Sequence, residues 1–213
     1  MFLALLLCTP AHAQDFVESS GPLEDAAFYR LVACAAPQDQ PCAKPFYKWE
    51  KTELTIGIVA RGDAFLGGKQ KRADAALVRA LQHLGEVPMA LILRQSTQAP
   101  DITIHLLDIP RSETISMGAA HVLDGLTMAN AITALDVTGS TINAAAIALS
   151  STLSIGQYES VMLEEITQAL GLITDIRNPY YNTRSILSQD ADNSLKTLGI
   201  QDRMALILHY PPD

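Results

Sequence analysis

The chain carries little positive charge for its length, and this limits the partners it can bind. Its 213 residues include 15 lysines and arginines against 23 aspartates and glutamates, which gives a formal net charge of −8 and a pI near 5.0. The short segment GGKQKR at 67–72 is too small to form a basic patch. Because proteins that bind the phosphate backbone need such a patch, the composition argues against a nucleic-acid partner.

Long hydrophobic runs are also lacking. No stretch reaches the ~20 apolar residues that a membrane-spanning helix requires, so we expect no membrane span. The short apolar run Phe2–Cys8 is followed by Ala11-His12-Ala13, the small-x-small pattern that signal peptidase needs before its cut. We therefore expect residues 1–13 to be a signal peptide cleaved before Gln14, and the mature protein to be soluble and periplasmic or secreted.

This leader lacks the positively charged segment that normally opens a signal peptide. A start codon placed a few residues too late would explain the gap, so the sequence leaves the completeness of the N-terminus open. Cys8 also allows a lipoprotein as an alternative. That alternative is disfavoured because Leu7 occupies the position where a small residue should precede a lipidated cysteine.

Cysteine is scarce, and its placement suits an oxidising compartment. Once the leader is removed, only Cys34 and Cys42 remain, with Pro37 and Pro41 between them. An even pair at short spacing in an exported chain predicts a small structural disulfide loop. The alternative is a pair of free buried thiols in a cytosolic protein. A metal site is disfavoured because no histidine lies near either cysteine in the sequence.

The remaining composition is that of an ordinary globular protein. With 48% hydrophobic and 18% charged residues, the chain is long enough to bury a full core and to form one main domain. We expect residues 14–50 to form an N-terminal helix and the disulfide loop, and residues 51–213 to form the main domain.

The spacing of apolar residues predicts the order of elements. It indicates a helix from Pro22, a strand at 53–60, a helix at 72–84, strands at 89–94, 101–107, 130–138 and 141–150, a long helix at about 156–173 and a C-terminal helix. Gly139-Ser140 is the expected turn of a hairpin. This order predicts an α+β fold with a mixed sheet, a backing helix, a long motif helix and a C-terminal helix.

Histidine is absent from the one segment where its absence is informative. The sequence EEITQALGL at 164–172 has the acid and the glycine of the metzincin zinc-peptidase helix HExxHxxGxxH at the same spacings, but none of its histidines. One interpretation is an ordinary amphipathic helix. In that case Glu164 and Gln168 form a solvated face, the helix packs through its Met, Ile and Leu side chains, and Gly171 lies near its C-terminal end.

A second interpretation makes this helix a functional site centred on Glu165. This residue lies one helical step, about 100°, from Glu164, and its expected helix neighbours are Val161, Met162, Ala169 and Leu172. We expect its carboxylate to be partly desolvated. Desolvation raises the pKa of a carboxyl group and makes it a candidate general acid or base.

The segments SVMLEEITQALGLITD (160–175), RSILSQ (184–189) and LGIQDRMALILHYPP (198–212), together with FYRLVAC, PCAKP and LTIGI upstream, resemble a family of exported bacterial proteins. That family is uncharacterised and carries a Glu-Glu-x-Thr-Gln-x-Leu-Gly helix. It is in turn similar to the zincin superfamily of metallopeptidases. The resemblance implies a zincin-like fold for residues 51–213, with the function unknown.

The resemblance assigns positions residue by residue. Glu164 and Gln168 occupy the two histidine ligand positions, and Glu165 occupies the position of the catalytic acid. Gly171 matches the turn glycine, and Thr174 falls at the third ligand position. All ligand histidines of the pattern are therefore replaced.

Two further positions complete the comparison. Asp175 directly follows the third ligand position, and Leu187 stands roughly where metzincins place the methionine beneath the metal. Oxygen ligands disfavour zinc and suit at best a weak Ca²⁺ or Mg²⁺ site. We therefore expect no metal ligand set and no cofactor.

The other histidines do not replace the missing ligands. His83 lies in the expected backing helix, His121 in a segment of ambiguous structure and His209 near the end of the last helix, where a lone histidine is usually packed or at the surface. His105 lies in an expected strand. It could reach the site if that strand ran beside the motif helix.

Three functions remain open. The first is a non-catalytic pseudoenzyme that binds an envelope peptide or protein in the former active-site cleft. The second is a carboxylate-based hydrolase that uses Glu165 with Glu164 or Asp175, with or without a hard metal ion. The third is a structural protein whose cleft is filled by side chains.

Side chains at the rim of the cleft would discriminate among these functions. Gln168 and Asp175 are the expected binding residues on the motif side. The loop Asn178–Asn182 is rich in turn formers and aromatic residues, so its Tyr180 and Tyr181 are the expected binding residues at the opposite rim.

Overall fold

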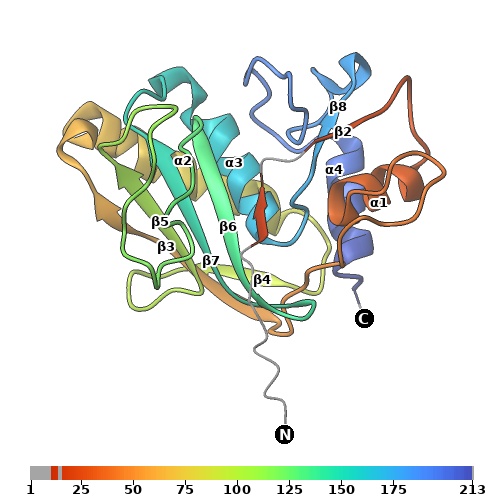
Figure 1. The fold of residues 1–213 in the computed structure, drawn as a ribbon, viewed down its shortest axis with the longest axis horizontal. Helices are drawn as coiled ribbons and strands as arrows, with labels where there is room; N and C mark the ends of the chain where they lie inside the picture. The colour runs from red at the N-terminus through yellow and green to blue at the C-terminus, as the bar shows by residue number, and fades with distance from the viewer. Residues whose placement is uncertain (1–10, 14–15, 213) are drawn as a thin grey trace, which may run out of the picture.

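The computed structural model describes residues 11–13 and 16–212, and it consists of a mixed β-sheet covered by helices (Figure 1). The α+β class predicted from the sequence is confirmed. The helices are α1 (Asp25–Cys34), α2 (Gly68–Gly85), α3 (Tyr158–Ala169) and α4 (Ile200–His209). The strands of the main sheet are β1 (Ala11–Ala13), β3 (Glu53–Arg61), β4 (Ile92–Gln95), β5 (Ile102–Leu107), β6 (Ala131–Thr138) and β7 (Thr141–Ser150).

The strand order of the main sheet is β1-β6-β7-β5-β3-β4. Strands β7, β5, β3 and β4 are parallel, and β6 runs antiparallel to β7 through the hairpin at Gly139-Ser140, as predicted. β1 is antiparallel to β6 on its other side. A separate two-stranded sheet, which the sequence did not predict, pairs β2 (Phe16–Glu18) with β8 (Asp175–Arg177) in parallel.

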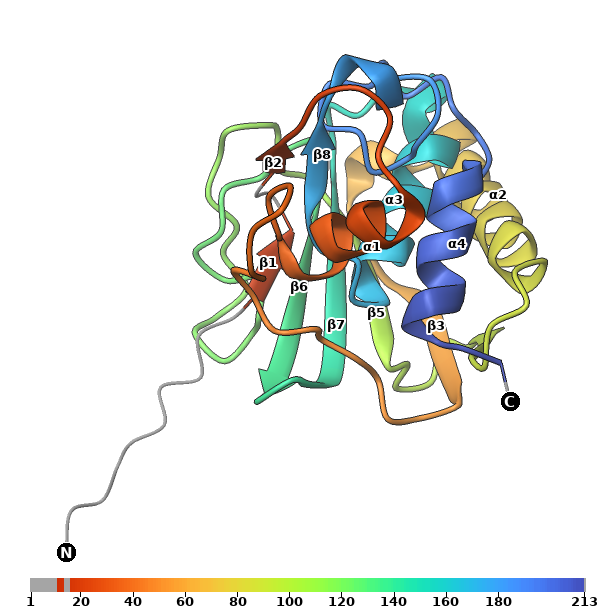
Figure 2. The same cartoon turned by 90° about the vertical axis from the view of Figure 1, so that its right-hand side faces the viewer.

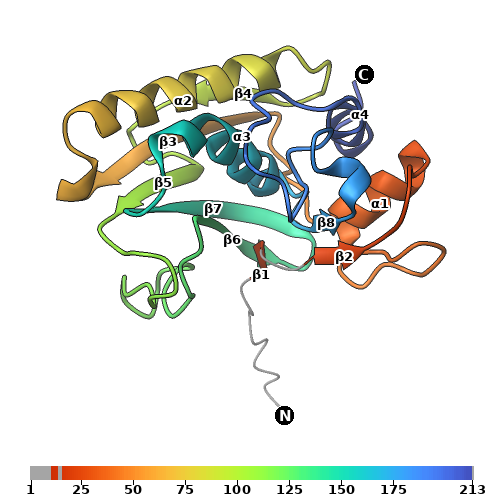
Figure 3. The same cartoon turned by 90° about the horizontal axis from the view of Figure 1, so that it is seen from above.

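Both faces of the main sheet are buried. Helices α2 and α3 cover one face, as Figure 3 shows from above, and side chains such as Ile104 and Leu106 of β5 pack beneath them. The loop between β5 and β6 covers the other face and contributes Ile115, Leu123 and Met128 to a second, smaller core. Alternate residues of β6 and β7 therefore face different cores.

Helix α3 is shorter than the sequence predicts, because it ends at Ala169 rather than at about residue 173. The chain reverses at Gly171, whose φ is +106°, and a Cβ atom there would lie 2.1 Å from the carbonyl oxygen of Tyr47. The carbonyl groups left unpaired at the helix end are bonded from elsewhere in the chain. Trp49 Nε1 donates to Ala169 O at 2.9 Å, and Tyr210 Oη donates to Leu170 O at 2.7 Å.

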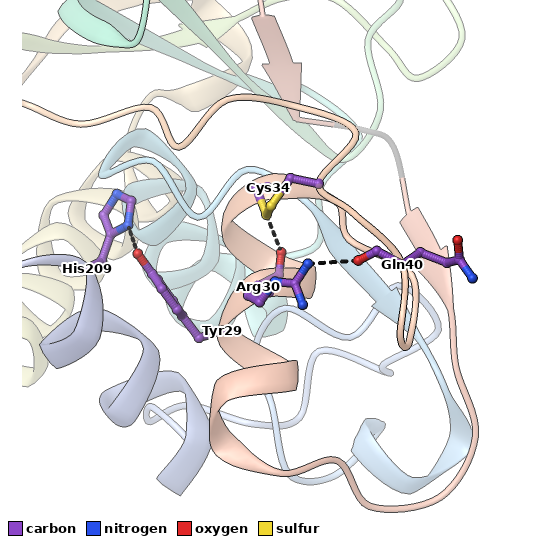
Figure 4. The surroundings of a disulfide bond; sticks show 6 residues. Tyr29, Arg30, Cys34, Gln40 and His209 are labelled. Carbon is purple, nitrogen blue, oxygen red and sulfur yellow. Dashed lines mark hydrogen bonds between the residues drawn. A yellow bond between two sulfur atoms is a disulfide. The ribbon is translucent and has the colours of Figure 1, made fainter.

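The disulfide between Cys34 and Cys42 is present and confirms that prediction. It closes the loop after α1, and the Arg30 guanidinium donates to the carbonyl of Gln40 within that loop at 2.7 Å (Figure 4). Figure 2 shows α1 lying beside α4. Between them, Tyr29 Oη and His209 Nδ1 are 3.1 Å apart, so the disulfide lies close to the junction of the two helices.

The expected signal peptide falls mostly on residues 1–10, which lie outside the described part of the chain. Its last three residues, Ala11–Ala13, form strand β1. Of the helices that the structure describes, none is both long enough and apolar enough to cross a bilayer.

Candidate functional site

A cavity of about 380 Å³ lies at the junction of α3, β6 and β8. Its volume falls within the range typical of small-ligand sites, roughly 300–1,000 Å³. Its polar lining comes mainly from Glu164, Glu165 and Gln168 of α3, Asp175 and Arg177 of β8, and Arg111 of the loop after β5. The sequence reasoning named four of these six residues.

Glu165 points from α3 toward β6. Its side chain is only 6% exposed, and the Thr133 hydroxyl donates a hydrogen bond of 2.6 Å to its Oε2. Burial raises the pKa of Glu165 to about 8, the Thr133 hydrogen bond opposes this shift, and the negative charge of Asp175 adds to it. The predicted desolvation of Glu165 is therefore confirmed.

Gln168 and Asp175 form the second part of the site. Gln168 Nε2 donates to Asp175 Oδ1 at 2.8 Å, and both side chains are buried. Burial raises the pKa of Asp175 to about 7, while the Gln168 hydrogen bond and the charge of Lys44 lower it. The other amide atom, Gln168 Oε1, is buried without a hydrogen-bond partner. Because about nine in ten buried polar groups have a partner, this acceptor requires an explanation.

Glu164 lies at the same cavity one residue before Glu165, and its side chain is half-buried. Its pKa lies well above the ordinary value because of burial and because Asp175, Glu165 and Asp202 carry negative charge nearby. Asp202 is itself satisfied, since it accepts from the Ser185 hydroxyl and from two backbone N–H groups. The cavity floor is therefore a cluster of carboxyl groups with raised pKa values.

Two arginines lie at the cavity wall. The Arg177 guanidinium sits 3.4 Å from the centre of the Phe16 ring and 3.4 Å from Asp190, so it is already engaged. Arg111 has no ion pair with any residue that the structure describes. Neither arginine is bonded to Glu165 or to the other floor carboxylates in the described part of the chain.

The solvated face expected for an ordinary amphipathic helix is wrong for this helix. Gln168 is 2% exposed, and Ser160 and Thr167 are also buried. The Thr167 hydroxyl donates to the carbonyl of Leu163, and the Ser160 hydroxyl donates to the carbonyl of Asn193 in the segment before α4. Helix α3 is buried on nearly all sides because the sheet, α2 and the segment after β8 all pack against it.

Tyr180 and Tyr181, expected at the rim, do not line the cavity that holds Glu165. They line a separate cavity with Arg184 and Ile200 on the far side of the small sheet. Tyr181 is a core residue, because its hydroxyl accepts from the backbone of Leu23 and donates to Gln201. Tyr180, in contrast, is 37% exposed.

His105 also lies away from the cavity. Its neighbours in β5, Ile104 and Leu106, face α2 and α3, so His105 faces the opposite side of the sheet. There it contacts the ring of His121, with the ring centres 5.1 Å apart. Leu187 is fully buried in the main core and does not fill the cavity.

The sequence reasoning missed Thr133, Arg111 and Arg177. Thr133 is the informative omission, because it is a polar residue in an otherwise apolar run and shares a strand face with Leu135. Such a residue in a buried strand requires a partner, and here the partner is Glu165. The two arginines carry no signal in the sequence, since their placement depends on a loop and on the unexpected strand β8.

The comparisons with known proteins give a family without an assigned activity. The model of a family described as "Protein of unknown function (DUF2927)" matches residues 26–213. The match spans the disulfide loop, the main strands from β3 onward and nearly all of the cavity. No curated protein matches the chain.

Proposed function

The chain belongs to the DUF2927 family of proteins of unknown function, and we propose that it is an exported, zincin-like pseudoenzyme that binds an extended peptide. The peptide would come from an envelope protein or polymer in the periplasm or outside the cell. It would add as a strand to β6 and place side chains in the cavity floored by Glu164 and Glu165.

The observation that carries this proposal is the pairing of β1 with β6. Ala11, His12 and Ala13 run antiparallel to Leu135, Ala134 and Thr133, so the chain's own N-terminal segment occupies this edge of the sheet as an added strand. An exposed strand edge is a general site for binding extended peptides, because main-chain groups supply the affinity.

The same strand connects the edge to the cavity. Thr133 pairs with Ala13 through its backbone and donates its hydroxyl to Glu165. A chain bound along β6 therefore lies beside the carboxyl cluster. Cleavage before Gln14, as the leader sequence suggests, would release β1 and free the edge in the exported protein.

The donor atoms support a function without zinc-peptidase chemistry. Glu164 and Gln168 stand where a zincin has histidines, and both offer oxygen. Within the described ranges, 11–13 and 16–212, no group of three or more His, Cys, Asp and Glu side chains is arranged to hold a metal ion. These features favour binding without metal-dependent hydrolysis.

A carboxylate-based hydrolase is the second candidate, and the position of Asp175 favours it. The charge of Asp175 raises the pKa values of both Glu164 and Glu165, so the three carboxyl groups are close together. Glu164 and Glu165 point in different directions from one helix and make a poor catalytic pair, and Asp175 supplies a second carboxyl group from another element. With pKa values of about 8 for Glu165 and about 7 for Asp175, one group can be protonated while the other is ionised near neutral pH. This is the arrangement that general acid–base catalysis requires.

Competition within the chain provides a direct test of peptide binding. The full chain and a chain that begins at Gln14 would be titrated with a panel of labelled, extended peptides and followed by fluorescence anisotropy. We expect tighter binding by the shorter chain, because β1 no longer occupies the edge. Equal binding by the two chains, or no binding by either, would contradict the proposal.

Mass spectrometry of the same mixtures separates the two candidates. Intact peptides after long incubation support the pseudoenzyme. Cleavage that is lost in Glu165→Gln and kept in Glu159→Gln would establish the hydrolase instead. Glu159 is a suitable control because it lies on the same helix but pairs with Arg79 outside the cavity.

A further inference from the structure

The residues of α3 and β8 that line the cavity present a cluster of acceptor atoms. Glu164, Glu165 and Asp175 contribute carboxylate oxygens, and Gln168 contributes Oε1. The donors next to these groups, the Thr133 hydroxyl and Gln168 Nε2, are each already bonded to a carboxyl group. Further donors lie along the cavity wall, on Arg111, Arg177, Asn130 and Gln189. A ligand that fits this floor must therefore supply donors.

Gln168 Oε1, which is buried without a hydrogen-bond partner, also indicates a ligand that supplies donors, and this indication does not depend on charge. Gln168 Nε2 is committed to Asp175, and this bond fixes the orientation of the amide. In this orientation Oε1 is buried without a hydrogen-bond partner. A buried acceptor of this kind is satisfied only when a donor enters.

The charge balance favours a cation. The cavity is lined by three carboxyl groups, Glu164, Glu165 and Asp175, and by two arginines, Arg111 and Arg177, so its lining carries an excess of negative charge when the carboxyl groups are ionised. The charge of Lys44 acts on Asp175. Arg177 is engaged with Phe16 and Asp190, away from the floor.

The directions of these oxygens select among cations. Glu164 and Glu165 diverge by about 100° around the helix, and Gln168 lies about one turn after Glu164. A guanidinium group prefers coplanar oxygens that match its fork, whereas an ammonium group directs three donors to different sides. Within the described residues, no set of three ligands is arranged for a metal ion. A primary ammonium group fits this arrangement best.

We propose that this cavity recognises a primary ammonium group on the chain bound along β6, through Glu164, Glu165, Asp175 and the Gln168 amide oxygen. The inference rests on the proposed peptide binding and specifies the class of peptide. Two sources carry this group: a lysine-type side chain in the middle of the peptide, and a free amino terminus.

Three peptides test the proposal and distinguish the sources, each titrated by calorimetry into the exported protein purified after its own processing. The first is acetyl-Ala-Ala-Ala-Lys-Ala-Ala-amide, the second is the same peptide with an Nε-acetylated lysine, and the third is hexa-alanine amide with a free amino terminus. Loss of a charged hydrogen-bonded contact weakens binding about tenfold or more.

The results separate the two proposals, recognition of an ammonium group and addition of a peptide strand to β6. Binding of the first peptide about tenfold tighter than the second supports recognition of a lysine-type side chain. The same advantage for the third peptide supports a free amino terminus. Equal affinity for all three overturns the ammonium inference and leaves strand addition intact, whereas no binding by any of them overturns the proposed function itself.

Variants of α3 provide a second measurement. Glu164 is half-buried, so Glu164→Gln is expected to fold, and it should remove most of the ammonium advantage. Glu159→Gln on the same helix should retain the full advantage. Unchanged discrimination in Glu164→Gln, with the melting temperature preserved, would overturn the assignment of the floor.

Discussion

The Thr133 hydroxyl on β6 donates a 2.6 Å hydrogen bond to Oε2 of Glu165 on α3, and this contact joins the edge of the sheet to the carboxyl cluster. The same hydroxyl lies 3.1 Å from the Glu165 carbonyl oxygen. Thr133, a residue of the proposed peptide-binding strand, therefore holds the Glu165 carboxyl group in place and opposes the larger rise in its pKa that burial causes.

Replacing Thr133 with valine should raise the pKa of Glu165 further above about 8, because the hydrogen bond now lowers it. The loss of a buried hydrogen bond should also cost about 1–3 kcal/mol of unfolding free energy. Carboxyl ¹³C NMR titration measures the first effect, and urea unfolding measures the second. Thr133→Ser keeps the hydroxyl and serves as the control, so an equal shift in both variants would contradict this account.

Stability should fall as the pH rises through the neutral range. Glu165 and Asp175 have pKa values of about 8 and about 7 in the folded protein, above the values of roughly 4 expected in the unfolded chain. The folded state therefore binds more protons between these limits, and raising the pH from about 5 to 8 should cost on the order of a few kcal/mol. Urea unfolding at several pH values measures this slope.

The double variant Glu165→Gln, Asp175→Asn is the matched comparison for that slope. It keeps the shapes of both side chains but removes their titration, so its stability should change much less between pH 5 and 8. The histidines act in the opposite direction at lower pH, because burial lowers the pKa of both His105 and His209 to about 4. An identical slope in the double variant would assign the pH dependence to other groups.

Gly171→Ala should be strongly destabilising, by about 2–4 kcal/mol. Its φ of +106° is a conformation that residues with a Cβ rarely adopt, and the added carbon would lie 2.1 Å from the Tyr47 carbonyl oxygen. Gly139→Ala is the control, because Gly139 also has a positive φ of +64° but has open space around it. Thermal unfolding of the two variants should show a clearly larger loss at position 171.

Reduction of the Cys34–Cys42 disulfide should lower the free energy of unfolding by about 2–3 kcal/mol. The intact disulfide closes a short loop and so restricts the conformations of the unfolded chain, and reduction removes that restriction. The melting temperature of the wild type in dithiothreitol and that of Cys42→Ser without reductant should agree. Dithiothreitol should leave Cys42→Ser unchanged. A wild-type protein whose melting temperature does not respond to reductant would contradict a stabilising role.

Metal addition should leave the melting temperature unchanged for Zn²⁺ and shift it weakly at most for Ca²⁺ or Mg²⁺, because the cavity offers oxygen ligands in place of imidazole. Elemental analysis of the purified protein and melting curves with each metal and with a chelator test this expectation. A zinc-dependent increase that disappears in Glu165→Ala would reverse the ranking of the proposed functions.

The fold was largely predictable from the sequence because its elements follow apolar periodicity. The strand at 53–60, the hairpin at 130–150 and the helix at 72–84 all lie within one or a few residues of their predicted bounds. The end of α3 was predicted too late. Leu172 and Ile173 continue the helical spacing of apolar residues, but they are buried after the reversal at Gly171.

The site was predictable in part. Glu164, Glu165, Gln168 and Asp175 meet at one cavity because they lie on one helix and on the strand that follows it closely in the sequence. Tyr180 and Tyr181 line a different cavity from the one that holds Glu165, because the distance between the loop at 178–182 and α3 leaves no signal in the sequence. The pairing of Ala11–Ala13 with β6 was not predicted, because long-range strand pairing leaves no local signal.

The end of α3 depends on both distant ends of the polypeptide. Trp49 bonds the carbonyl of Ala169, Tyr210 bonds the carbonyl of Leu170, and His209 Nε2 lies 2.9 Å from the carbonyl of Tyr47. During translation these contacts cannot form until residues 209 and 210 have emerged from the ribosome. The end of α3 therefore gains its full set of bonds only late in synthesis, well after the helix itself has been made.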